Sequence, residues 1–370
     1  MISEDFFATL HQHFNNALPF VAYRKPNNVE VKALLQKDNT IHFINDFSEH
    51  GFVFAPFDNK EKAIVMPLNA SEAITTDFVL SNDIDISLHE TKHSESEKLQ
   101  HIQLVQKGLE VIKNNTFQKV VLSRCEVVDI SKDNPIKIFK RLLNKYTTAF
   151  VYCWYHPKVG LWLGATPETL VQVTGNRFKT MALAGTKKYN GKDDVLWDDK
   201  EKKEQEYVTN FIVDSVKDVV ETLKISQPST VKAGNVLHLK TALSGVLKSE
   251  LNTIIKKLHP TPAVCGLPRE IAKHFILKEE NYKREFYTGF LGELNIKEKQ
   301  LRNTNRQNVE NNAYASIKTS SHLFVNLRCM QLKDSKALIY VGGGITNESD
   351  AEEEWQETIN KTLTIKAVLD

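Results

Sequence analysis

The 370-residue sequence has few cysteines, no long hydrophobic run and no excess of charge of either sign. Its four cysteines are far apart and form no Cys-x-x-Cys pair, which argues against a zinc ribbon or a thioredoxin-type site. Apolar stretches such as 63–68 and 149–154 fall far short of the roughly 20 residues that a membrane-spanning helix needs. With 48 Lys and Arg against 46 Asp and Glu, the chain also lacks the basic excess typical of nucleic-acid-binding domains. We therefore expect free thiols, no membrane span, no nucleic-acid partner and a small-molecule ligand.

Signals for export, sequence repeats and flexible linkers are also missing. The N-terminus carries Glu4 and Asp5 in place of a basic leader followed by an apolar block, so we expect a cytoplasmic protein. No repeat period and no Pro-, Gly- or Ser-rich tract divides the chain. One polar stretch, Ser81–Glu97, is typical of a surface connection and suggests a boundary between residues 1–90 and 91–370. No coiled-coil pattern demands a partner chain, so we predict a monomer or a weak homodimer.

Helical and strand patterns alternate along the chain. Ser94–Asn114 carries apolar residues three and four positions apart, as one face of a helix requires: Leu99, Ile102, Val105, Leu109 and Ile112. Strand-like runs joined by short turns favour antiparallel pairing: Thr40–Asn45, Gly51–Phe57, Phe117–Ile130, Ala149–Tyr155, Gly160–Ala165, Thr169–Val173 and Phe178–Ala184.

The second half of the chain continues this alternation. We predict helices at Pro135–Lys145, at about Val195–Leu223 and from about Asp350, and strands at Tyr287–Ile296, His322–Lys333 and Lys336–Val341. Lys297–Ser321 is rich in Asn, Lys and Arg, which predicts a mobile loop. The fold class is therefore α/β with a large antiparallel component.

Two residues are candidates for an acid and a base. Lys119 lies in the hydrophobic strand pattern FQKVVLSR, on one face with Val121 and Ser123. Enclosure of that face would disfavour the charged ammonium and permit a basic amine; the alternative is an edge lysine that reaches solvent. Glu168 follows a strand in GATPE, where apolar walls would keep it protonated and able to act as an acid. The alternative is a solvated turn glutamate.

Carboxylates on two predicted helices suit a metal ion. Glu204 and Glu206 lie in KKEQEYV, while Glu354, Glu357 and Lys361 share one helical face at positions i, i+3 and i+7. Separated acids that converge on a cleft are typical Mg²⁺ ligands. A solvated helix face with an i,i+4 ion pair is the alternative.

Groups that could bind an anion are also present. Arg328 lies in VNLRCM, a strand pattern of otherwise apolar residues, and its planar guanidinium suits a carboxylate. Gly342–Gly344 follow a strand and precede a helix, where bare backbone N–H groups can meet an anion. This glycine run matches neither a Walker A motif nor a dinucleotide-binding fingerprint, and it could merely turn the chain.

The order of the motifs resembles one family. KVVLSR, GATPE, ALAGT, KKEQEYV, HLKT, HPTPAVCGLP, REFYTGFLG, VNLRC, GGGI and EEEWQET occur as in the chorismate-utilising enzymes, specifically the isochorismate synthases of menaquinone and siderophore biosynthesis. The resemblance covers about residues 95–370; residues 1–90 resemble the family's variable N-terminal part only loosely. It implies an α/β (α+β) fold of large stacked antiparallel β-sheets flanked by helices. It also implies a Mg²⁺ requirement, conversion of chorismate to isochorismate, and no amidotransferase subunit.

The resemblance further implies roles for individual residues. Lys119 looks like the base that activates water for attack on ring carbon C2, and Glu168 looks like the acid that protonates the departing C4 hydroxyl. Glu204 and Glu357 match the Mg²⁺ ligands, with Glu354 and Glu201 acting through water or from behind them. The groups that would hold the substrate are Ala184, Gly185, Thr186, His238, Ala263, Tyr287, Arg328, Gly342 and Lys361.

Two alternatives and two departures from the family pattern stay open. Relatives that make anthranilate, aminodeoxychorismate or salicylate usually carry Thr at the position of Ala263, and aminodeoxychorismate synthases carry Lys at Ala184. Both positions therefore favour plain water addition here. A non-catalytic anion- or metal-binding protein of this fold is the second alternative. Gln205 replaces a common His and Cys265 a common Ser; we expect both to be tolerated, although Gln205 leaves the arrangement behind the metal ligands open. The destination of the product, whether menaquinone, a siderophore or salicylate, is also open.

Overall fold

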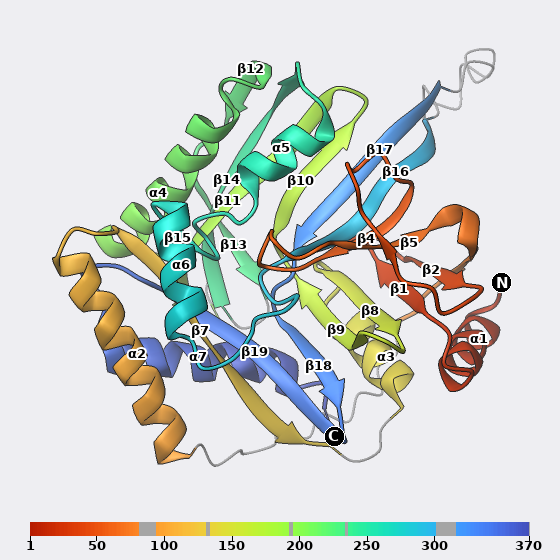
Figure 1. Cartoon of the computed structure of the whole chain (residues 1–370), viewed down its shortest axis with the longest axis horizontal. Coiled ribbons are helices and arrows are strands. Elements are labelled where there is room, and N and C mark those ends of the chain that lie inside the picture. Colours follow the sequence, from red (N-terminus) through yellow and green to blue (C-terminus); the bar gives the residue numbers. More distant parts are fainter. Residues whose placement is uncertain (81–93, 131–133, 192–194, 234–235, 301–315, 370) are drawn as a thin grey trace.

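The computed structural model describes residues 1–80, 94–130, 134–191, 195–233, 236–300 and 316–369, which form two large antiparallel sheets with helices on their outer faces (Figure 1). Sheet A has the strand order β15 (Gly266–Leu267), β7 (Lys119–Asp129), β19 (Lys336–Ile345), β18 (Cys329–Lys333), β9 (Gly160–Thr166), β8 (Phe150–His156), β1 (Phe20–Arg24), β2 (Glu30–Gln36) and β6 (Ser71–Asp77). Sheet B has the order β12 (Val220–Ile225), β14 (Val236–Leu247), β11 (Arg177–Lys188), β10 (Thr169–Thr174), β17 (Ser316–Val325), β16 (Phe290–Gln300), β4 (Gly51–Ala55), β5 (Ile64–Pro67) and β3 (His42–Phe43), with β13 (Ser229–Ala233) beside β14. The predicted fold class is confirmed.

Seven α-helices and one short 3-10 helix accompany the sheets in the described residues: α1 (Ser3–Asn15), η1 (Leu68–Ala70), α2 (Glu95–Lys113), α3 (Pro135–Lys145), α4 (Asp199–Val216), α5 (Leu251–Leu258), α6 (Arg269–Glu279) and α7 (Ala351–Lys366). Polar residues fix several helix starts, because their side chains accept from free backbone N–H groups. Ser94 caps α2, Asn134 caps α3 ahead of Pro135, and Asp350 accepts from two backbone amides of α7. None of these helices is long and apolar enough to cross a membrane.

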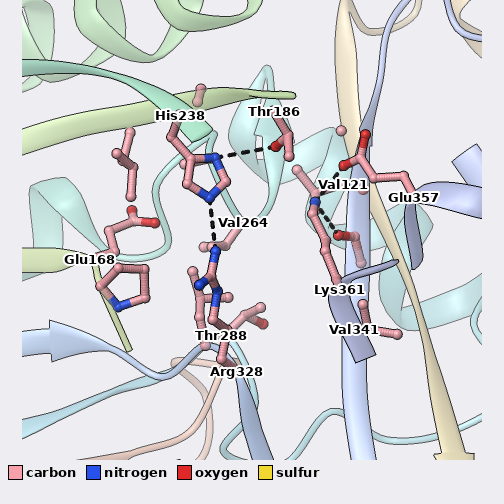
Figure 2. A pocket seen from close by; sticks show the side chains of 18 of the residues that line it. Val121, Glu168, Thr186, His238, Val264, Thr288, Arg328, Val341, Glu357 and Lys361 are labelled. Atoms are coloured by element: carbon pink, nitrogen blue, oxygen red, sulfur yellow. Dashed lines mark hydrogen bonds and ion pairs between the residues drawn. The ribbon is translucent and has the colours of Figure 1, made fainter. Parts of the chain in front are cut away.

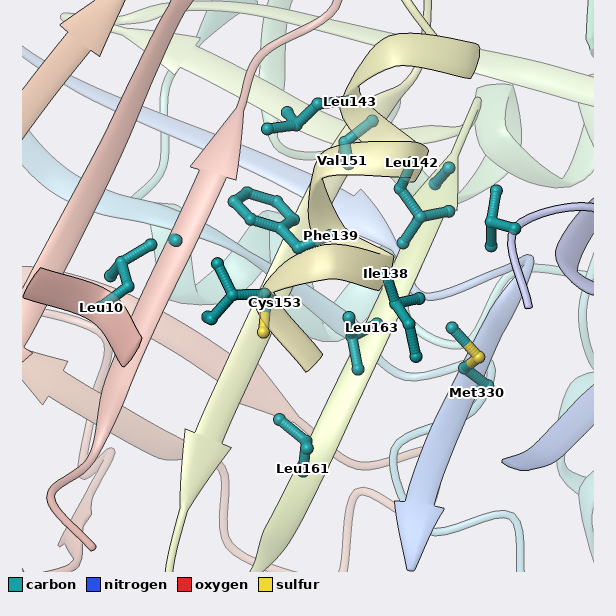
Figure 3. Packing of buried hydrophobic residues seen from close by; sticks show 14 of the residues in the cluster. Leu10, Ile138, Phe139, Leu142, Leu143, Val151, Cys153, Leu161, Leu163 and Met330 are labelled. Atoms are coloured by element: carbon teal, nitrogen blue, oxygen red, sulfur yellow. The ribbon is translucent and has the colours of Figure 1, made fainter. Parts of the chain in front are cut away.

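An aromatic layer joins the two sheets. Phe54 of β4 contacts Trp154 of β8, with ring centroids 4.7 Å apart, and Phe150 of β8 stacks on Phe324 of β17 at 4.2 Å. Outside the sheets, helices cover further apolar clusters. Figure 3 shows one of them, where Phe139 of α3 packs over strands β8 and β9. Burial of this apolar area on both faces of each sheet stabilises the stack and leaves a fixed frame for polar side chains.

The N-terminal segment is part of both sheets. Strands β1, β2 and β6 extend sheet A, while β3, β4 and β5 extend sheet B. The connection expected at Ser81–Glu97 falls mostly on residues 81–93, which lie outside the described part of the chain. The helix predicted after it is α2, although Leu99 is 55% exposed and does not belong to the buried face.

Some predicted boundaries are wrong. The helix predicted to Leu223 ends at Val216, because the β-branched residues that follow pair as β12 with β14. The loop predicted at Lys297–Ser321 is shorter, since β16 continues to Gln300 and β17 starts at Ser316; residues 301–315 lie outside the described residues. The strand expected at Thr40–Asn45 is only two residues long.

The single strand predicted at His322–Lys333 is two strands in different sheets. The chain leaves sheet B at the end of β17 and enters sheet A at the start of β18, so residues 326–328 form a corner between the sheets. Tyr287 likewise lies before β16 and not in it. This corner carries Arg328 into the space between the sheets, which the strand pattern alone did not predict.

Candidate active site

A cavity of about 840 Å³, including the open space at its mouth, lies where β7, β11, β14 and β19 meet α4 and α7. Figure 2 shows Glu168 on one side, Glu357 and Lys361 on the other, and His238 and Arg328 between them. The lining includes the following predicted residues: Glu168, Ala184, Gly185, Thr186, Glu204, His238, Ala263, Tyr287, Arg328, Gly342, Glu357 and Lys361. Segments from across the sequence thus meet at one concave site, as small-molecule sites usually require.

Arg328 is placed by the corner between the sheets. Its backbone has φ of +48°, a conformation that side-chain-bearing residues rarely adopt. Asn326 holds the corner: its side-chain amide donates to the Phe286 carbonyl at 2.9 Å and its carbonyl accepts from the Tyr152 hydroxyl at 2.6 Å. The guanidinium of Arg328 then lies 3.0 Å from His238 Nε2. Burial lowers the pKa of Arg328 to about 10, so it stays charged at neutral pH and can meet an anion.

His238 is a neutral hydrogen-bonding residue of the cavity. Burial, together with the positive charges of Arg328 and Lys361, lowers its pKa to about 3. Its Nδ1 lies 3.0 Å from the Gly185 carbonyl oxygen and 3.3 Å from Thr186 Oγ1. We assign the proton to Nδ1, because Nε2 then accepts from Arg328 and every ring nitrogen has a partner. The histidine therefore ties β14 to the bulge in β11 that forms one cavity wall.

Glu168 is a buried carboxyl that holds its proton at neutral pH. It is 3% exposed and follows β9 at the cavity wall. Burial raises its pKa to about 8, although the positive charge of Lys119 opposes the shift. A carboxylic acid in this state can donate a proton to a bound ligand near pH 7. It is not the solvated turn glutamate that was the alternative expectation.

Lys119 is fully buried and pairs with Glu204. Its Nζ lies 2.8 Å from Glu204 Oε1, so the lysine is not an edge residue that reaches solvent. Lys119 lies behind Glu204 and Gly344, and those two residues line the cavity directly. Burial would raise the pKa of Glu204, but Lys119, Lys361 and Lys200 hold it below its usual value. Glu204 is therefore a charged carboxylate in a cavity where the carboxyl of Glu168 is neutral.

Two further carboxylates come from α7. Glu357 pairs with Lys361 at 2.5 Å, and Lys361 also donates to the Gly342 carbonyl at 2.9 Å. Glu354 is 2% exposed and pairs with Lys200 of α4 at 3.2 Å. Burial and the negative charge of Glu357 raise the pKa of Glu354 to about 7. The helical face predicted from the i, i+3, i+7 spacing does point toward the site, and it also contains the i,i+4 ion pair.

The glycine run of β19 makes room for these carboxylates. A Cβ at Gly344 would lie 2.4 Å from Glu204 Oε1, and one at Gly343 would lie 2.7 Å from Glu354 Oε2. A Cβ at Gly342 would lie 2.7 Å from the Leu122 carbonyl oxygen. These distances are shorter than real Cβ contacts, so the run is needed for close approach. It does not follow the strand or turn the chain, as the sequence suggested, because Gly342–Gly344 lie inside β19 and pair with β7.

Carboxylates are the type of side chain that binds a hard cation, but in this structure they do not converge closely on one point. Oε2 of Glu354 and Oε2 of Glu201 are buried without a hydrogen-bond partner, which a cation or its bound water would supply. Burial and the negative charge of Glu357 raise the pKa of Glu354, and the positive charge of a bound cation would offset both effects. Within the described residues, however, no three His, Cys, Asp or Glu side chains converge as closely as metal ligands do. Glu201 lies behind Gly185 and does not line the cavity.

Some lining residues were not predicted from the sequence. Thr288, Val264, Leu327 and Tyr340 also line the cavity, and no local pattern distinguishes them from other turn or strand residues. The structure also shows where Gln205 and Cys265, the two departures from the family pattern, lie. Gln205 donates to Thr241 Oγ1 at 2.6 Å and so links α4 to β14. Cys265 is a buried free thiol, as are Cys153 and Cys329, whereas Cys125 is half-buried.

Comparison with known proteins gives the family. The profile described as "Chorismate binding enzyme" matches residues 54–300, and a second profile of that description matches residues 313–367. The chain belongs to the chorismate binding enzymes.

Individual relatives agree with this membership. Isochorismate synthase MenF of Escherichia coli (strain K12) is 27% identical over 279 residues, which cover 72% of this chain and 59% of the relative. Anthranilate synthase component 1 of Lactococcus lactis is 26% identical over 270 residues, 70% of this chain and 54% of the relative. The aligned part thus spans little more than half of each of these relatives. The solved structure of the menaquinone-specific isochorismate synthase MenF from Escherichia coli has the same fold, with a TM-score of 0.75 at 21% identity over 95% of this chain and 89% of that chain.

The protonated state of Glu168 predicts how stability depends on pH. In the folded protein this carboxyl loses its proton near pH 8, but in the unfolded chain it does so near its ordinary pKa of 4.5. Between these values the folded state binds the extra proton, so the free energy of unfolding falls as pH rises. Glu168→Gln cannot titrate, and its stability relative to the wild type should rise by on the order of 3 kcal/mol from pH 5 to pH 8 in urea denaturation.

The exposed Glu206, on the same chain but outside the cavity, gives the matched control. Glu206→Gln should keep the wild-type dependence of stability on pH. If Glu168→Gln also keeps it, the carboxyl of Glu168 is ionised in the folded protein and the assignment of a neutral acid is wrong.

Proposed function

We propose that this protein is an isochorismate synthase, which converts chorismate to isochorismate by adding water at C2 with loss of the C4 hydroxyl. The observation that carries the proposal is one cavity lined by a protonated carboxyl, Glu168, by Glu204 with Lys119 paired behind it, and by the cations Arg328 and Lys361. Family membership and the names of the relatives support the same substrate. The reaction is an isomerisation, because the water that is added replaces the water that leaves.

The charges of the cavity suit a dianion. Chorismate has two carboxylates, and Arg328 and Lys361 lie in different walls of the cavity, on the corner between the sheets and on α7. Each cation can pair with one carboxylate or lie near it. Arg328 can donate two parallel hydrogen bonds to a carboxylate. The neutral His238 and the hydroxyl of Thr186 add hydrogen-bonding groups without adding charge.

Glu168 is the proposed acid and Lys119 the proposed base. Glu168 carries a proton at neutral pH and would donate it to the departing C4 hydroxyl. Lys119 would take a proton from the attacking water, which forms the new C2–O bond as the C4–O bond breaks. The apolar walls around Glu168 keep it protonated, as its role as the acid requires.

Magnesium would be held by Glu204 and Glu357, with Glu354 and Glu201 binding its water ligands. The support is the pair of buried, unpartnered oxygens on Glu354 and Glu201 and the clustering of charge along the β19 glycine run. Mg²⁺ commonly binds through one or two carboxylates, water and an anionic substrate group. When bound, the ion would orient a substrate carboxylate and offset its charge.

The cavity also favours water addition over the reactions of related synthases. Ala184 and Ala263 both line it and contribute only methyl groups, so neither position offers an amine or a hydroxyl. An amine-adding or pyruvate-releasing enzyme remains the alternative, and the similarity to anthranilate synthase component 1 makes it worth testing. We propose further that the protein is cytoplasmic, acts without an amidotransferase and is a monomer or weak homodimer.

The first test is the identity of the product. Purified protein supplied with chorismate and Mg²⁺, without ammonia or glutamine, should form isochorismate, measured by chromatography of the reaction mixture. Pyruvate should stay at the background level. Release of pyruvate as the main outcome would instead place the protein with the lyase-type relatives.

The second test concerns the acid and the base. Lys119→Met and Glu168→Gln should each lower kcat by about 10²- to 10⁴-fold with little change in substrate affinity, because general acid and base groups typically contribute that much. Wild-type kcat/KM should fall above about pH 8, where Glu168 loses its proton. That decline should vanish in the residual activity of Glu168→Gln. A Lys119→Met variant with normal turnover would exclude the lysine as base.

The third test concerns the metal. Glu204→Gln and Glu357→Gln keep the side-chain volume but remove the negative charge that a Mg²⁺ ligand needs. Both should lose Mg²⁺-dependent turnover at millimolar Mg²⁺ while keeping a native circular dichroism spectrum. Glu353→Gln, on the exposed face of α7, is the control and should behave as the wild type. Normal activity of either cavity variant at low Mg²⁺ would contradict the assignment.

A further inference from the structure

Three carboxylates of the site each have one lysine partner. Glu204 pairs with Lys119 at 2.8 Å, Glu357 with Lys361 at 2.5 Å and Glu354 with Lys200 at 3.2 Å. Lys119 and Lys361 already have proposed roles toward water and substrate. Lys200 has none: it does not line the cavity, and within the described part of the chain its hydrogen bond to the site goes to Glu354.

Glu354 lies close to Glu357, one of the two proposed metal ligands. A Cβ on Gly343 would lie 2.7 Å from Glu354 Oε2 and 3.7 Å from Glu357 Oε1, so both oxygens lie over one point of β19. A Cβ on Gly344, which points to the other face of β19, would lie 2.4 Å from Glu204 Oε1, and the negative charge of Glu204 still acts on Glu354. Glu354 Oε1 is occupied by Lys200 and Ser349, whereas its buried Oε2 has no hydrogen-bond partner. Oε1 of this carboxyl is thus paired with an ammonium, and Oε2 is available to a ligand.

Lys200 is the cation of this group that can leave most easily. It lies one helical turn before Glu204 on α4, and its side chain is 26% exposed, whereas that of Lys119 is fully buried. A lysine has a flexible four-carbon stem, so its ammonium can swing into solvent once a bound cation replaces its charge beside Glu354. Besides Glu354, the negative charges of Glu357 and Glu204 act on Lys200 and favour its charged form.

We propose that Lys200 is a resident counter-cation, which neutralises the carboxylates when no metal is bound and which competes with the divalent cation for them. This inference rests on the proposed function, because it takes the Glu204–Glu357–Glu354 group as the metal site. Buried carboxylates without a compensating charge repel each other, and an ammonium offsets that repulsion in the metal-free protein. The same ammonium then weakens metal binding, since a divalent ion must act against its positive charge or displace it.

A purely structural role for Lys200 makes a different prediction. Lys203, on the same helix, joins α4 to the segment before α7 through Glu348 at 2.7 Å, but it is exposed and lies outside the carboxylate group. If Lys200 were only a tether of this kind, its removal would lower stability and leave metal affinity unchanged. Lys203→Met therefore serves as the matched control for charge removal on α4.

The experiment measures binding of Mn²⁺, as a probe for Mg²⁺, to the purified protein without chorismate, by electron paramagnetic resonance of the free ion. Lys200→Met should bind Mn²⁺ about tenfold more tightly than the wild type, the order expected when a positive charge a few ångströms from the ion is removed. Lys200→Arg, which keeps the charge, and Lys203→Met should match the wild-type Kd. In thermal melts, Lys200→Met should have a lower Tm than the wild type in EDTA and a larger rise in Tm on addition of Mg²⁺.

The outcomes separate the inference from the proposed function. Equal Mn²⁺ affinity of the wild type and Lys200→Met, with measurable binding to both, overturns the role of Lys200 and leaves the metal site standing. Binding that survives unchanged in Glu204→Gln or Glu357→Gln overturns the metal site itself, and the inference with it. Tighter binding in Lys203→Met to the same extent as in Lys200→Met would show a general effect of net charge, which also overturns the inference.

Discussion

Compensation of charge inside a buried cavity is the constraint on which the arrangement of this site depends. Transfer of a charged carboxylate or ammonium out of water is costly unless an opposite charge or hydrogen bonds replace the water. The site meets this requirement in two ways. Glu204, Glu357 and Glu354 each contact a lysine, whereas Glu168 keeps its proton and stays neutral. Glutamate side chains at this site are therefore charged where a lysine is the neighbour and protonated where the neighbours are apolar.

The stacked sheets make this arrangement possible. The aromatic layer between them, with Phe54 against Trp154 and Phe150 against Phe324, fixes the two sheets relative to each other. The crossing from β17 to β18 then carries Arg328 into the cavity, and the Gly342–Gly344 run lets the carboxylates of α4 and α7 approach a bare strand. Polar chemistry is thus placed by rigid strands and by helices that pack on their outer face, which favours a preorganised site.

Much of the site could be predicted from the sequence, because motif order and side-chain spacing carry information. Alternation along FQKVVLSR put Lys119 and Val121 on one face, and the spacing of Glu354, Glu357 and Lys361 put them on one face of a helix. The structure has both. The helix ends, the division of residues 322–333 into two strands and the length of the 297–321 connection were predicted wrongly, because each depends on pairing with a distant strand.

By itself the sequence determined the fold class, the family and the set of chemical groups, since these follow from local periodicity and from motifs that need no partner. Only the tertiary structure decided which groups meet. That Lys119 contacts Glu204 and not solvent, that Glu168 is protonated, and that Lys200 pairs with Glu354 are results of burial and of contacts between residues far apart in the chain. The physical reason is that desolvation and Coulomb interactions depend on distances in space, which a one-dimensional pattern does not contain.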